Sequence, residues 1–112
     1  MVFSELISKI KTLEISETRF DTPHFFEFVI EAKEVAKLLG LLDGFFGSAK
    51  KSAGQQPSIE TAEQAENYGG IRANQTFYFT DTAQSFTYAM IWPWLDGSKV
   101  TVKIEEAFRS TG

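Results

Sequence analysis

The sequence predicts an α+β domain: an antiparallel sheet of about five strands with two or three helices packed on one face. Three observations support this fold. Apolar and polar residues alternate through much of residues 71–105, as they do in half-buried strands. The connections within that stretch are short, which favours a C-terminal antiparallel meander of three strands. Two earlier segments repeat apolar residues at spacings of three and four, the period of a helix.

The composition indicates one domain spanning residues 1–112, because a chain of this length can bury a core without disulfides or a structural metal. It has eleven Phe, three Tyr and two Trp but one His and no Cys. The aromatic content therefore serves packing more than chemistry. A chain without Cys fits a reducing compartment. We expect a soluble, cytoplasmic protein that needs no cofactor and does not bind a membrane.

The first helix is expected over residues 3–12, with Ser4 as its N-cap. Its apolar stripe consists of Phe3, Leu6, Ile7, Ile10 and Leu13. Glu5, Lys9 and Lys11 interrupt the N-terminal segment, so it does not resemble the apolar region of a signal peptide. An irregular first strand follows over residues 13–19, and a turn is expected at residues 21–23.

Residues 24–31 alternate as a strand whose inward side chains are Phe26, Phe28 and Ile30. Helical spacing then returns and predicts a helix over residues 32–46. Residues 47–57 are rich in Gly, Ser, Lys and Gln and contain nothing to bury, so a flexible internal loop is expected there. A short polar helix over residues 58–67, capped by Ser58 or Thr61, comes next.

Three C-terminal strands complete the sheet, with turns at residues 80–84 and 93–97. The apolar phase of each alternating strand is assigned to the core. The inward side chains are expected to be Phe77 and Phe79, then Phe86, Tyr88, Met90 and Trp92, then Val100, Val102 and Ile104.

The opposite phase defines an outward face of this meander. It is expected to carry Arg72, Asn74, Thr76 and Tyr78 on one strand and Lys99, Thr101 and Lys103 on another, with Ala89 and Ile91 between them. Such a face could bind an acidic partner or single-stranded nucleic acid through charge and stacking. The alternative is a solvated face whose lysines pair with carboxylates such as Glu27 or Glu31. The net charge of −4 disfavours nucleic acid as a partner.

Two further features could carry function. Trp94 and Leu95 follow Pro93 in a turn, where the ring either folds back over the end of the core or stands exposed as an anchor for a partner. His24 lies between Asp21 and Glu27, so a carboxylate could orient its ring for acid–base chemistry. Against this, a lone His at the start of a strand is most simply a turn residue.

Three functions remain open. The first is a non-catalytic interaction module that docks a protein or associates with itself as a homodimer through Trp94, Leu95, Tyr78 and Arg72. The alternative is a carrier of a small apolar ligand in a Phe-lined pocket. An enzyme centred on His24 is the least supported, and neither catalytic nor metal-binding residues are assigned.

Overall fold

The computed structural model of this chain describes residues 2–66, 74–81 and 84–108. It confirms an α+β fold with a five-stranded antiparallel sheet and three helices. The elements in chain order are α1 (Phe3–Ile10), β1 (Ile15–Thr22), β2 (Phe25–Glu31), the 3-10 turn η1 (Ala32–Glu34), α2 (Val35–Phe46), α3 (Ile59–Glu66), β3 (Thr76–Asp81), β4 (Ser85–Pro93) and β5 (Lys99–Phe108).

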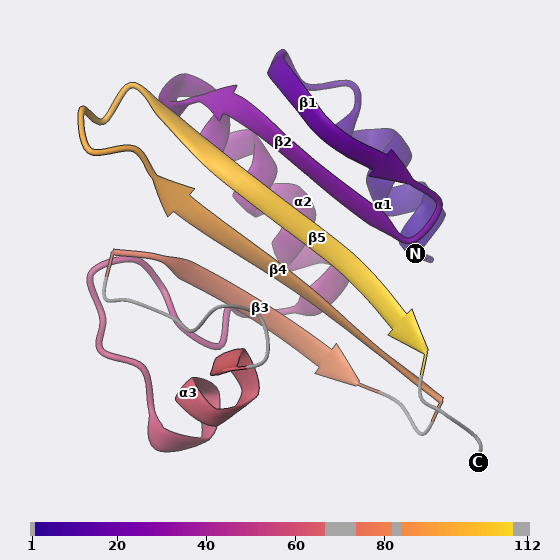
Figure 1. The fold of residues 1–112 in the computed structure, drawn as a ribbon, viewed down its shortest axis with the longest axis vertical. Helices are drawn as coiled ribbons and strands as arrows, with labels where there is room; N and C mark the ends of the chain where they lie inside the picture. Colours follow the sequence, from indigo (N-terminus) through magenta and orange to yellow (C-terminus); the bar gives the residue numbers. More distant parts are fainter. Residues whose placement is uncertain (1, 67–73, 82–83, 109–112) are drawn as a thin grey trace.

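The strand order is β1-β2-β5-β4-β3, so the C-terminal strand β5 lies at the centre of the sheet (Figure 1). Val102 of β5 pairs with Phe28 of β2 on one side and with Ile91 of β4 on the other. The predicted meander is therefore confirmed, and β5 joins it to the N-terminal hairpin.

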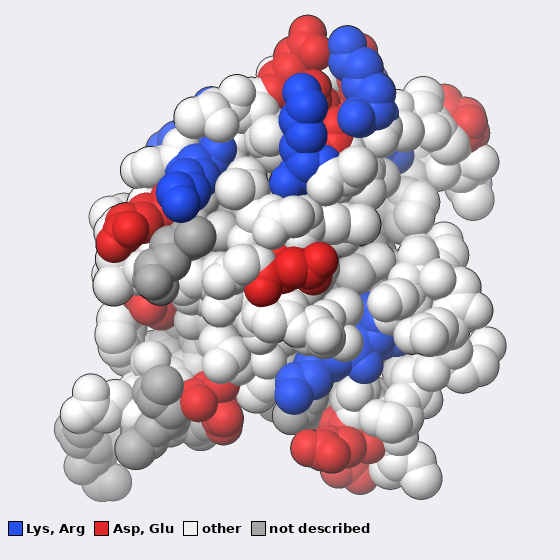
Figure 2. All heavy atoms as spheres, turned by 180° about the vertical axis from the view of Figure 1, so that it is seen from behind, with Lys and Arg blue, Asp and Glu red and all other residues white. Residues whose placement is uncertain are grey.

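Helices α1 and α2 lie on the same side of the sheet, behind the strands in Figure 1. Their apolar residues cover one sheet face, and the inward assignments in β2 and β5 are confirmed. The buried cluster comprises Phe3, Leu6 and Ile10 of α1, Leu38 and Leu42 of α2, and sheet residues that include Phe26, Phe28, Ile30, Val100, Val102 and Ile104. Seen from this side, the middle of the molecule carries few charged side chains (Figure 2).

The inward assignment of β3 and β4 is wrong by one residue. Tyr78, Ala89 and Ile91 belong to the helix-covered cluster, and Thr76 is also buried. The predicted inward residues Phe77, Tyr88 and Met90 lie on the opposite face, where they pack with Ala65 of α3. Both phases of these strands include buried residues, so alternation does not separate a buried face from an exposed one. Periodicity cannot identify the helix-covered face of such strands.

The expectation that residues 47–57 bury nothing is wrong at Lys51, whose exposed fraction is 2%. The Lys51 amide donates to the Phe77 carbonyl at 3.2 Å, and the Phe77 amide donates to the Lys51 carbonyl at 2.9 Å. The Lys51 ammonium donates to the carbonyl oxygens of Ser52 and Gln75. Its burial lowers the pKa of this amine. Lys51 thus forms an isolated antiparallel β-bridge with Phe77 at the outer edge of β3. The flexibility of the rest of residues 47–57 stays a prediction.

Of the predicted N-cap residues, one is confirmed and one is wrong. The Thr61 amide donates to the Ser58 side-chain oxygen at 3.1 Å, which confirms Ser58 as the cap of α3. Ser4 lies inside α1 and does not cap it, because the N-cap position is Val2. Within the three described ranges, no helix has the length and apolar character that a membrane span requires.

Candidate functional site: the open sheet face

The sheet surface opposite α1 and α2 keeps solvent access over β1, β2 and β5, and we call it the open sheet face. Val29 is buried on this face, and the half-buried or exposed side chains of the face are Phe20, Phe25, Glu27, Glu31, Trp92, Trp94, Lys99, Thr101, Lys103 and Glu105. Strand register explains why they share this surface. Directly opposed residues of neighbouring strands point to the same side, as in the pairs Phe25–Glu105, Glu27–Lys103 and Thr101–Trp92.

Two lysines of β5 lie against aromatic rings on this face. The Lys103 ammonium is 5.5 Å from the ring centre of Phe25 and 6.0 Å from that of Tyr88. Four residues earlier, the Lys99 ammonium is 5.4 Å from the ring centre of Trp94. Contacts at these distances are attractive because the face of an aromatic ring is electronegative. Each lysine is therefore held over a ring rather than extended into solvent.

Neither lysine forms an ion pair with any residue in the described part of the chain. The neighbouring carboxylates have other partners. Glu105 accepts a hydrogen bond from the Tyr88 hydroxyl at 2.8 Å, and Glu27 lies 4.0 Å from the Arg19 guanidinium. The predicted pairing of the lysines with Glu27 or Glu31 is not formed, although their predicted outward direction is confirmed.

One end of the open sheet face is strongly apolar. Phe20 is 58% exposed, and its ring meets the edge of the Phe25 ring with centres 5.7 Å apart. The opposite end contains Trp94, whose indole nitrogen donates to the Thr101 hydroxyl at 3.0 Å. Along β5, the Lys99 and Lys103 ammonium groups thus lie between the Trp94 ring at one end and the Phe25 ring at the other.

Among the predicted binding residues, Trp94 and Leu95 lie at the Trp94 end of this face. Trp94 is half-buried, since its ring folds back onto Thr101 and Lys99 of the open sheet face. Leu95 is fully exposed in the turn between β4 and β5. The Trp94 ring therefore folds back, as one of the two alternatives expected, but onto the open sheet face and not over the end of the core.

Tyr78 does not join them, and its outward assignment is wrong. Its exposed fraction is 2%, and its hydroxyl donates to Asp43 of α2 on the helix-covered side at 2.6 Å. Tyr78 lies directly opposite Ala89, and both side chains point to the sheet face that the helices cover. Arg72, the fourth predicted binding residue, lies outside the described residues.

Phe20, Phe25 and Trp92 belong to the open sheet face but were not identified from the sequence. Phe25 was identifiable in principle, because assigning Phe26 and Phe28 to the core places Phe25 on the other side. Trp92 shares the parity of Phe86, Tyr88 and Met90, which predicts a core position for it. No comparable signal marks Phe20, since β1 changes register twice against β2.

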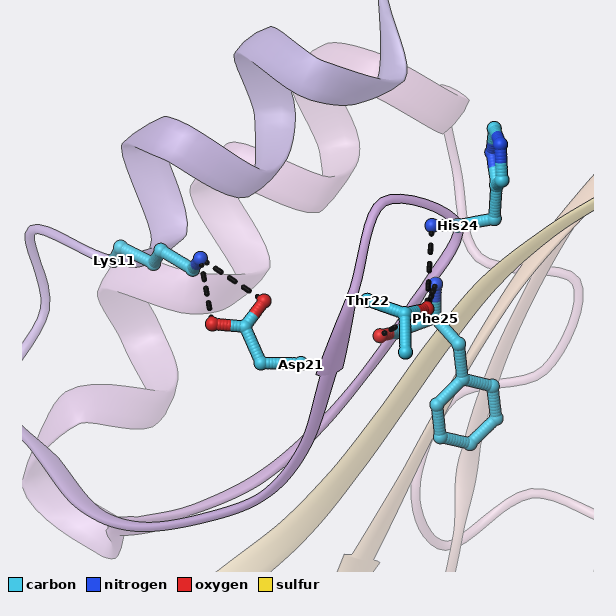
Figure 3. A network of polar contacts seen from close by, with 5 residues as sticks. All are labelled: Lys11, Asp21, Thr22, His24 and Phe25. Atoms are coloured by element: carbon cyan, nitrogen blue, oxygen red, sulfur yellow. Dashed lines mark hydrogen bonds and ion pairs between the residues drawn. The ribbon is translucent and has the colours of Figure 1, made fainter.

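His24 is exposed at the β1–β2 turn and is not brought together with Asp21. Its Nδ1 atom lies 3.4 Å from Glu106, and its ring meets the edge of Phe108 at 5.2 Å. Figure 3 shows the ring pointing away from Asp21, whose carboxylate instead binds the Lys11 ammonium at 2.9 Å. No group of three or more metal-ligating side chains occurs in the part of the chain that the structure describes.

Comparisons with protein-family models, curated proteins and solved structures find no match to this chain. Function must therefore be argued from the geometry above.

Proposed function

We propose that this chain is a non-catalytic interaction module that associates with a second copy of itself through the open sheet face. The observation that carries the proposal is the pairing of Lys99 and Lys103 with partly exposed rings, without an ion pair among the described residues. These groups can gain contacts on association that they lack in the single chain.

The residue types suit an interface. Aromatic side chains dominate interface energies because they bury a large area at little conformational cost. Phe20, Phe25, Trp92 and Trp94 offer such rings on one surface. Leu95 extends the same surface beyond the end of the sheet.

The charge pattern favours a second copy over a polyanion. The open sheet face mixes Lys99 and Lys103 with Glu27 and Glu105, so nucleic acid would meet carboxylates as well as lysines. A surface with both signs can complement itself across a two-fold axis, where each contact is made twice. The chain's net charge of −4 also opposes a polyanion.

Other assignments have less support. A different protein could bind the same face, and it would compete with self-association. The apolar-carrier alternative calls for a Phe-lined pocket, yet two hollows of the described surface are lined without Phe. The cytoplasmic location stays an expectation based on the absence of Cys.

Sedimentation of the wild type over a concentration series tests the proposal. We expect a reversible dimer with a dissociation constant of about 1–100 µM, appropriate for a small interface. The Lys99→Glu/Lys103→Glu variant should raise this constant about tenfold or more. The control, Lys9→Glu/Lys50→Glu, changes charge equally at exposed positions away from the face and should leave it unchanged. A wild type that remains monomeric at a protein concentration of about 1 mM, ten times the highest dissociation constant expected, contradicts the proposal.

A further inference from the structure

A second surface, on the helix-covered side of the sheet, has the features of a small-molecule site. A hollow of about 480 Å³ lies between α2, the segment that follows it, and β3. This volume is within the range of ligand pockets, roughly 300–1,000 Å³. The lining residues used below are Leu39 and Asp43 of α2, Ser48 and Ser52 of the following segment, and Thr76 and Tyr78 of β3.

Of the described side chains that line this hollow, only Asp43 is charged. Its Oδ1 atom accepts the hydrogen bond from the buried Tyr78 hydroxyl at 2.6 Å. Burial and the adjacent carboxylate both raise the pKa of Tyr78, so the phenol remains a donor at neutral pH. The Oδ2 atom of Asp43 has no hydrogen bond or ion pair with the described residues. One oxygen is thus fixed and the other is free to accept.

The rest of the lining adds further acceptors beside an apolar wall. Thr76 is only 8% exposed, and its hydroxyl forms no hydrogen bond within the described part of the chain. The hydroxyls of Ser48 and Ser52 also line the hollow, and Leu39 supplies an apolar surface. Hydroxyl oxygens accept hydrogen bonds as readily as they donate them.

Backbone hydrogen bonds anchor the segment after α2 to β3 at Lys50 and Lys51. The backbone amides of Lys50 and Lys51 donate to the Phe77 carbonyl at 2.9 and 3.2 Å. These bonds fix Ser48 and Ser52 beside β3 and limit the ordering that a ligand would require.

We propose that this hollow binds a small primary ammonium ion with a short hydrocarbon chain. An ammonium group has three donors and no acceptor, which matches the free Asp43 oxygen and the surrounding hydroxyls. The hydrocarbon chain would lie against Leu39. A carboxylate of the same length is repelled by Asp43, and an alcohol has no positive charge to attract this carboxylate. The site is independent of the open sheet face.

Titration of ¹⁵N-labelled protein at pH 7 with n-hexylamine, n-hexanol and hexanoate tests the proposal on the wild type. Hexylamine is protonated at this pH, as a lysine side chain is. We expect it to shift the amide signals of Ser52 and Thr76 and to bind about tenfold more tightly than hexanol. Hexanoate should bind more weakly still. Equal binding of the alcohol or the acid, or no binding of the amine, would overturn the proposal.

Two matched substitutions locate the effect. Asp43→Asn should remove the preference for hexylamine over hexanol, whereas Asp21→Asn, the same change at an exposed residue outside the hollow, should retain it. An Asp43→Asn variant that keeps the preference contradicts the assignment. If this variant does not fold, the three-ligand comparison on the wild type still decides. Sedimentation of the Asp43→Asn variant should match that of the wild type, so this site and self-association can fail separately.

Discussion

Single side chains show how burial decides the role of a residue that the sequence leaves open. Tyr78 is a residue type that is common in surface contacts, because it has an aromatic ring with a polar hydroxyl at its tip. The structure buries it and gives its hydroxyl one partner, Asp43. The ring adds packing to the core, and the hydroxyl joins β3 to α2. Its contribution is therefore to stability, and that contribution depends on pH.

Tyr78→Phe should lower the free energy of unfolding by about 1–2 kcal/mol near neutral pH, because a hydrogen bond to a carboxylate is lost. The folded state raises the pKa of Tyr78. The stabilisation is thus fully present below the unfolded value near pH 10 and declines as pH rises above it. Urea unfolding from pH 7 to 11 measures the difference between wild type and Tyr78→Phe. A difference that grows above pH 10 would contradict the assignment.

At the scale of elements, the inward phase could be predicted for strands that are buried on one face only, but not for strands that are buried on both faces. In β5, Val100, Val102 and Ile104 alternate with Lys99, Thr101 and Lys103, so polarity identifies the outward phase. In β4, Tyr88 and Met90 alternate with Ala89 and Ile91, and all four are buried. The choice of the apolar phase as inward is wrong here, because the face opposite α1 and α2 is also covered at β3 and β4, where Ala65 of α3 belongs to the same buried cluster as Phe77.

Ala89→Leu tests the corrected phase. Ala89 is fully buried in the helix-covered cluster, so three added carbon atoms should overpack it and cost about 1–3 kcal/mol. The same side chain placed at an exposed position of β1 by Thr18→Leu should change stability by less than about 0.5 kcal/mol. Thermal unfolding of both variants compares them. Similar costs would mean that the phase of β4 is not as described.

The segment between α2 and α3 offers a second test at this scale. Lys51→Ala removes a buried chain and leaves the carbonyl groups of Ser52 and Gln75 without its ammonium, so we expect a loss of about 2 kcal/mol or more. Lys50→Ala, at the exposed neighbouring position, should cost less than about 0.5 kcal/mol. Denaturant unfolding measures the loss of stability in each variant. Equal losses for Lys51→Ala and Lys50→Ala would show that Lys51 does not anchor this segment.

At the scale of the whole molecule, the fold gives the two sheet faces different roles. The α1–α2 side holds most of the core and the hollow beside Asp43, while the other side keeps rings and charges accessible over β1, β2 and β5. Composition predicted a packing-rich domain without catalytic residues but not where its rings would be exposed. That depends on which strands α3 leaves uncovered, a long-range property that local periodicity does not contain.

The central claim is that two copies meet through open sheet faces whose charges complement one another. It is tested most directly by mixing two charge variants. Lys99→Glu/Lys103→Glu makes the face more acidic, and Glu27→Lys/Glu31→Lys makes it more basic. Each variant should fail to associate with itself, because like charges then oppose each other across the two-fold axis.

An equimolar mixture restores opposite charges on the facing surfaces, since each acidic face meets a basic one. Analytical ultracentrifugation should show that the separate variants are monomers and that the mixture is a dimer, with both variants confirmed as folded by circular dichroism. The contrary result is a mixture that stays monomeric, or separate variants that dimerise as the wild type does; either would show that the open sheet face does not bind a second copy of this chain.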